Sequence, residues 1–177
     1  MRRFLDALYF YAGVAAAISL FLIFALVTVQ LCARMLDGLM RLAGQPALGF
    51  IIPSIAEICG FLLAAASFLA LAHTLMVGGH IRVSLVLSRL GPSARRYVET
   101  FVGLLAASSA AYAAVALARL AWRSWRFGDV SYGIIPIPLA LPQALMTLGV
   151  AVLAVALVDL SVKAWRYRQY IQSGSEA

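Results

Sequence analysis

Charged residues are scarce in this chain of 177 residues. Only 12% of them are Asp, Glu, Lys or Arg, whereas 64% are apolar. A soluble domain usually carries about a quarter charged and about half apolar residues. A soluble chain of this length could not hide so much apolar surface in a single core. The composition therefore predicts an integral membrane protein, with lipid as the main solvent of its surface.

Cysteine and histidine are also scarce, with two of each. Cys32 and Cys59 form neither a CxxC pair nor a metal-binding spacing, and we interpret them as small apolar fillers, with a disulfide as the alternative. His73 and His80 would lie two helical turns apart, about 10 Å along the axis, which prevents both from binding opposite sides of one haem iron. We expect His73 to pack in the helix bundle and His80 to lie at the cytoplasmic interface.

Motifs of enzymes and cofactor sites are missing as well. The chain has no phosphate-binding glycine loop, no HExxH and no Ser/His/Asp grouping with plausible spacing. We therefore expect no enzymatic activity, no cofactor and no metal site.

Lysine is nearly absent, since 13 of the 14 basic residues are arginine, and the net charge is +7. In a soluble protein this charge would suggest nucleic acid as a partner. Here the arginines flank apolar stretches, which is typical of anchoring at phospholipid headgroups. We therefore expect a phospholipid membrane as partner, and no nucleic acid.

Four apolar stretches are long enough for a membrane-spanning helix, which needs about 20 residues. They cover residues 7–33, 55–77, 98–118 and 139–158. The first is much longer than the apolar part of a cleaved secretory signal, about 7–15 residues, so we interpret it as an uncleaved span. The sequence predicts an all-α, integral membrane fold with one membrane domain over residues 1–177.

The basic residues also predict an orientation. Nine Lys and Arg residues flank the spans on the side of the two termini and the second connection, against five in the first and third connections. The more basic side of a membrane protein faces the cytoplasm. Both termini are therefore expected in the cytoplasm.

Two of the connections have an amphipathic pattern. Residues 34–42 and 82–90 place polar and apolar side chains on opposite sides of a helix, as in helices that lie at the membrane surface. Gly44 and Pro46 would end the first, and Gly91-Pro92 the second. We therefore predict two short interfacial helices in addition to the four spans.

Charged residues near span ends are the candidate functional residues. Glu57 lies just inside the second span, and Arg34 ends the first span at the same membrane face. We favour an ion pair between them, with a proton-coupling role for Glu57 as the alternative. At the other face, Asp159 and Lys163 are spaced for an i, i+4 pair, which is weak where water reaches it.

Three arginines recur at helical spacing after the third span, interleaved with Trp122 and Trp125. We call them the arginine stripe: Arg119, Arg123 and Arg126. They fit an aromatic belt with arginines that reach the headgroups. The alternative is an exposed cationic surface for a partner outside the cell membrane.

Small residues recur every four positions in two of the spans, as in helices that approach one another closely in lipid. The two sets do not identify their partners, which could include another subunit. They are Ala56, Gly60 and Ala64 in the second span, and Gly103, Ala107 and Ala111 in the third.

Several short stretches follow one another in a recognisable order. They are Gln30-Leu31-Cys32-Ala33-Arg34, Ile55-Ala56-Glu57-Ile58, Gly78-Gly79-His80-Ile81-Arg82-Val83, Ser131-Tyr132-Gly133-Ile134-Ile135-Pro136-Ile137-Pro138, Pro142 and Gly149. Taken in this order, they resemble the small membrane subunit of tripartite ATP-independent periplasmic (TRAP) transporters. Two departures concern uncharged positions, namely Leu139-Ala140-Leu141 where the family often has an aromatic residue, and Thr147 where it often has proline.

The resemblance implies a non-catalytic scaffold in the bacterial inner membrane. In that family a large multi-span subunit carries the substrate and sodium sites, and a periplasmic binding protein delivers an organic acid. The matching positions give structural or interface candidates, to which we add the arginine stripe as a possible contact with the binding protein. The candidates are Arg34, Glu57, His80, Arg82 and Pro138.

Two other functions remain open from the residues alone. The first is a self-contained small exporter that uses Glu57 as its proton carrier. The second is a membrane anchor subunit of a redox complex. Both lack the family resemblance but fit a chain of four spans.

Overall fold

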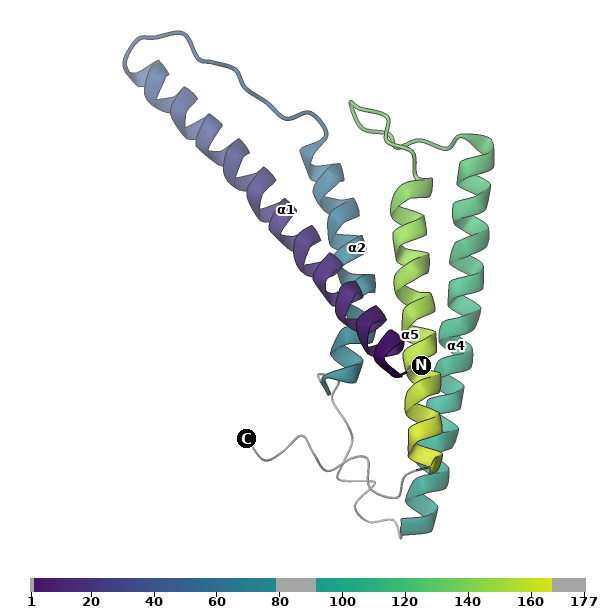
Figure 1. Ribbon diagram of the computed structural model, residues 1–177. Helices are drawn as coiled ribbons and strands as arrows, with labels where there is room; N and C mark the ends of the chain where they lie inside the picture. The colour runs from purple at the N-terminus through teal and green to yellow at the C-terminus, as the bar shows by residue number, and fades with distance from the viewer. Residues whose placement is uncertain (1, 79–91, 167–177) are drawn as a thin grey trace, which may run out of the picture.

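The computed structural model describes residues 2–78 and 92–166. It contains the helices α1 (Arg2–Leu42), α2 (Ile55–Met76), α4 (Pro92–Phe127) and α5 (Ala140–Arg166) (Figure 1). All four are long and apolar enough to cross a membrane. The prediction of an all-α fold with four spans is confirmed. Of the two predicted interfacial helices, the one at 82–90 lies outside the described residues.

The helices form a row rather than a closed bundle. α2 packs against α1 on one side and α5 on the other, and α5 packs against α4. α1 and α5 make only a few contacts, and α1 leans away from α2 toward its C-terminal end (Figure 1). A row of this kind leaves many apolar side chains uncovered by the chain itself, above all on α1 and α4, whereas most apolar side chains of α2 and α5 are buried or half-buried. Phe21, Phe101 and Trp125 are examples, with exposed fractions of 66%, 68% and 70%.

α1 is longer than predicted, because residues 34–42 continue the first span instead of forming a separate helix. No proline interrupts the helix before Leu42, and the helix ends where Gly44 adopts a φ of 72°, a conformation that favours glycine. The 41 residues of α1 give a length of about 61 Å. This is about twice the thickness of the hydrocarbon core, so α1 must incline or protrude in a bilayer.

Small residues fill the contacts between neighbouring helices. An added Cβ at Gly149 of α5 would lie 2.5 Å from the backbone carbonyl of Phe68 in α2. In the same way Gly103 of α4 faces the side chain of Ser161 in α5, and Gly13 of α1 faces the ring of His73 in α2. The bundle position predicted for His73 is therefore confirmed.

The two sets of small residues have different surroundings. In the third span, Ala107 is buried and Gly103 lies against α5, so these two pack the chain's own helices together, whereas Ala111 is exposed. In the second span, Ala56 is exposed and Gly60 has no atom near its absent side chain. That side of α2 is therefore open to a helix of another chain.

Gly149→Ala should destabilise the protein, because the new methyl group meets the backbone of Phe68 and Leu69, which cannot move aside as a side chain would. Overpacking of this kind costs about 1–3 kcal/mol. The thermal unfolding midpoint of the full chain in detergent would measure it. Gly38→Ala is the matched control, since Gly38 is helical and faces open space. An unchanged midpoint for Gly149→Ala would show that α2 and α5 are not held at this distance.

Candidate functional site

The polar contacts that join separate segments gather mainly at one end of the molecule. We call it the loop end: α1 and α4 finish there, α2 and α5 begin there, and it carries the connections 43–54 and 128–139 (top of Figure 1). The opposite end, which we call the terminal end, carries the start of α1 and the end of α5. Because a four-span chain returns to its starting side, the first residue of α1, Arg2, and the last residue of α5, Arg166, both lie at the terminal end.

The connection between α4 and α5 folds into a hairpin over residues 129–139, which we call the α4–α5 hairpin. The Ser131 N–H donates to the Ile137 carbonyl (2.9 Å), and the Leu139 N–H donates to the Asp129 carbonyl (3.0 Å). The Ser131 hydroxyl also accepts a hydrogen bond from the Ile137 N–H (3.1 Å). These bonds hold the two arms together and leave Tyr132 and Ile134 exposed at the tip.

Glu57 lies against this hairpin. An added Cβ at Gly133 would overlap the Glu57 carboxylate and would lie 2.7 Å from the Ser54 hydroxyl. The Ser54 hydroxyl accepts a hydrogen bond from the Ile135 N–H (3.0 Å). Oε2 of Glu57 is enclosed and has no hydrogen-bond partner in the described structure. Two of the stretches that carried the resemblance, 55–58 and 131–138, are thus in contact.

The predicted ion pair between Arg34 and Glu57 is wrong. Both residues are described, no ion pair joins them, and Arg34 is exposed on α1. The physical reason is the inclination of α1, which carries its C-terminal turns away from the start of α2 (Figure 1). Glu57 turns instead toward the hairpin that precedes α5.

The connection 43–54 is tied back to α1 by two side chains. The Asp37 carboxylate accepts hydrogen bonds from the Leu48 N–H (2.8 Å) and the Gly49 N–H (3.2 Å). Oε1 of Gln30, a buried residue, accepts one from the Ile52 N–H (2.8 Å). Sequence reasoning missed both contacts. Asp37 lies within residues 34–42, which were assigned to a separate interfacial helix. The sequence did offer one signal for the first contact. Asp37 lies shortly before a connection whose backbone N–H groups need hydrogen-bond acceptors.

The arginine stripe lies along one side of the last turns of α4, and its three side chains are exposed. No described carboxylate forms an ion pair with them. Arg123 lies 6.0 Å from the centre of the Phe127 ring, which fits a weak cation–π contact. Arg119 also lines an open hollow on α4, together with Ala111, Tyr112 and Val115. The stripe is therefore a cationic surface that the described part of the chain leaves uncovered.

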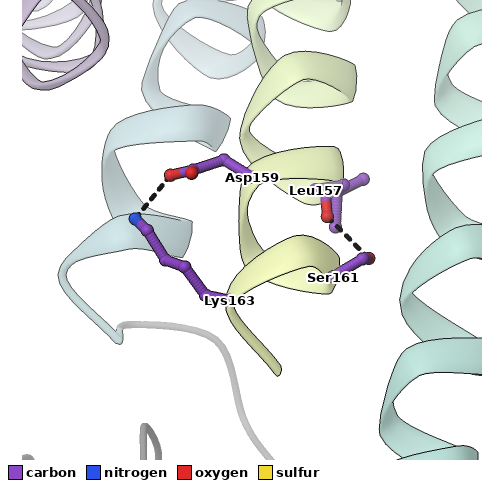
Figure 2. Close-up of polar contacts among 4 residues, drawn as sticks. All are labelled: Leu157, Asp159, Ser161 and Lys163. Atoms are coloured by element: carbon purple, nitrogen blue, oxygen red, sulfur yellow. Dashed lines mark hydrogen bonds and ion pairs between the residues drawn. The ribbon is translucent and has the colours of Figure 1, made fainter. Parts of the chain in front are cut away.

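At the terminal end, Asp159 and Lys163 form the predicted i, i+4 ion pair, with 2.5 Å between Nζ and Oδ2 (Figure 2). Their side chains are only 19% and 10% exposed. The pair is therefore more shielded than the water-exposed end pair that the sequence predicted. One turn of the same helix also carries Ser161, whose hydroxyl donates to the Leu157 carbonyl (2.8 Å) beside Gly103.

The remaining candidates have simple outcomes. Pro138 is exposed, and its carbonyl accepts a hydrogen bond from the Leu141 N–H (3.2 Å) at the start of α5. His80 and Arg82 lie outside the described residues. Cys32 and Cys59 are free thiols, so the alternative of a disulfide between them is not realised. Over residues 2–78 and 92–166, no three His, Cys, Asp or Glu residues gather in a way that could hold a metal ion.

Asp37→Ala should release the connection 43–54 from α1, because the Leu48 and Gly49 N–H groups lose a charged acceptor. Bonds to charged groups stabilise by about 1.5–3 kcal/mol. Limited proteolysis with chymotrypsin, which can cut after exposed Phe50, would show faster cleavage. Arg41→Ala, on the same helix and also exposed, is the control. Equal cleavage of wild type and Asp37→Ala would contradict the anchoring role.

Comparison with known proteins identifies the family of the chain. The family model described as the DctQ component of tripartite ATP-independent periplasmic transporters matches residues 31–167, which is most of the chain. The matched region includes Glu57, the α4–α5 hairpin and the arginine stripe. No curated protein and no solved structure matches the chain. The chain belongs to the DctQ family, and it is a small membrane component of a TRAP transporter of the bacterial inner membrane.

Proposed function

We propose that this chain is a non-catalytic scaffold that braces the large multi-span subunit of its transporter in the membrane. The observation that carries the proposal is the open row of helices. Each helix packs closely on at most two others, and large apolar side chains stay exposed chiefly on α1, α4 and α5. A partner with many helices can cover one face of such a row, while lipid covers the other. The exposed Ala56 and Gly60 on α2 suit a close helix–helix approach.

The same proposal assigns the transport chemistry to the other components. The large subunit would bind the organic acid and the sodium ions that drive its uptake, and the binding protein would deliver the substrate. No cofactor is required in this chain. Both chain ends would lie in the cytoplasm, as the distribution of arginines favours, so that the loop end faces the periplasm.

Co-expression with the large subunit tests the scaffold function. We expect the two chains to purify together through an affinity tag on one of them, and the large subunit alone to give less protein and no uptake. Gly60→Leu would place a large side chain on the open side of α2 and should lower the copurified amount several-fold. Gly38→Leu, which makes the same change at a helical glycine of α1 that also faces open space, is the matched control for an added side chain. Full uptake by the large subunit and the binding protein without this chain would refute the proposal.

The arginine stripe is proposed as a docking surface for the binding protein, since in this orientation it faces the periplasm and no described carboxylate neutralises it. Reversing the charge of both Arg123 and Arg126 to Glu should reduce uptake, and more strongly at low salt, where screening is weakest. Transport assays at two salt concentrations would measure the effect. Unaltered uptake at low salt would leave these arginines as lipid anchors.

The rival function, an exporter driven by protons through Glu57, has a specific weakness. Glu57 lies in the first turn of α2 at the loop end, and a coupling carboxylate is expected nearer the middle of the membrane. Reconstitution of this chain alone in vesicles separates the two functions. We expect no proton-coupled flux, and a flux that disappears in Glu57→Gln would favour the exporter.

A further inference from the structure

The contact between Glu57 and Gly133 raises the question of why residue 133 is a glycine. The backbone φ of Gly133 is not positive, whereas those of Gly44, Gly49, Gly78 and Gly128 are. Backbone conformation therefore gives no reason for glycine at this position. The space around it does, because an added Cβ would overlap the Glu57 carboxylate and press on the Ser54 hydroxyl.

A neighbouring hydrogen bond attaches the hairpin to the segment before α2. Ser54 precedes α2 and accepts the N–H of Ile135, two residues beyond Gly133 in the hairpin. The hairpin is thus bonded to the segment before α2 at Ile135 and pressed against the first turn of α2 at Gly133. A side chain at 133 would displace the ends of the Glu57 and Ser54 side chains, and movement of the Ser54 hydroxyl would weaken its bond with the Ile135 N–H.

We propose that Glu57 and Gly133 form a matched steric pair which, together with the Ser54–Ile135 hydrogen bond, latches the α4–α5 hairpin onto the start of α2. The latch joins the two halves of the row at the loop end, α1 and α2 on one side and α4 and α5 on the other. It also fixes the exposed tip residues Tyr132 and Ile134, which flank Gly133. This inference does not depend on the proposed scaffold function, because it concerns contacts within one chain.

The amide of Ile135 reports on the latch. Its N–H is bonded to Ser54, whereas the N–H groups of Ser131, Ile137 and Leu139 are bonded within the hairpin. Opening of the latch should therefore speed hydrogen exchange at Ile135 and leave exchange at the other three unchanged. Exchange read at single residues in the full-length chain in detergent separates release of the hairpin from its unfolding.

Gly133→Ala should raise the exchange rate at Ile135 about three- to tenfold, the range expected when one hydrogen bond is lost. Ser54→Ala should do the same without adding volume, so it tests the latch even if Gly133→Ala folds poorly. Adding Glu57→Ala to Gly133→Ala frees the overlapped space and should bring the rate back toward that of wild type. Gly60→Ala, which faces open space on α2, is the control and should leave the rate unchanged.

Two results would overturn the proposal. One is wild-type exchange at Ile135 in both Gly133→Ala and Ser54→Ala. The other is exchange at Ile135 that is as fast in the double variant, Gly133→Ala with Glu57→Ala, as in Gly133→Ala alone. That result would mean that the Glu57 carboxyl group is not what excludes a side chain at 133.

Discussion

The close approach of α2 and α5 is the contact on which the rest of the structure depends. α1 packs chiefly on α2, and α4 packs chiefly on α5, so the α2–α5 contact is what joins the two pairs along the row. Gly149 allows it by removing a side chain where the backbone of α2 passes. In lipid, packing of this kind replaces the hydrophobic effect as the main attraction between helices. The buried residues of the described helices are accordingly mostly alanines and other small side chains.

The arrangement of polar groups follows from the same constraint. A row with little interior has few places to shield a charge, so the charged and hydrogen-bonded groups gather at the two ends. At the terminal end, Asp159 and Lys163 neutralise one another on α5. At the loop end, side chains of α1 and the segment before α2 accept backbone N–H groups of the two connections. The polar contacts thus hold the two ends of the row together, and its faces stay apolar. A larger membrane partner could cover one of these faces.

The sequence predicted the spans well and the contacts between them less well. Apolar length alone located four helices, since lipid requires about 20 apolar residues wherever a helix crosses. Helix ends were less predictable: α1 runs on to Leu42 because nothing between Ala33 and Leu42 forbids helical backbone. The partner of Glu57 could not be predicted, because it depends on the inclination of α1 and on a hairpin distant in sequence. The Asp159–Lys163 pair was predictable, since a spacing of four residues fixes such a contact within one helix.

The inclination of α1 has a consequence for the surrounding bilayer. A helix of about 61 Å is too long to stand upright within a hydrocarbon layer of about 30 Å, so the part of α1 that does not protrude crosses the layer obliquely and separates its two ends laterally. The protein therefore touches a longer perimeter of lipid than four upright helices would. Its fit to the membrane then depends on acyl-chain length, since a thicker bilayer favours a steeper α1 and a thinner one a flatter α1.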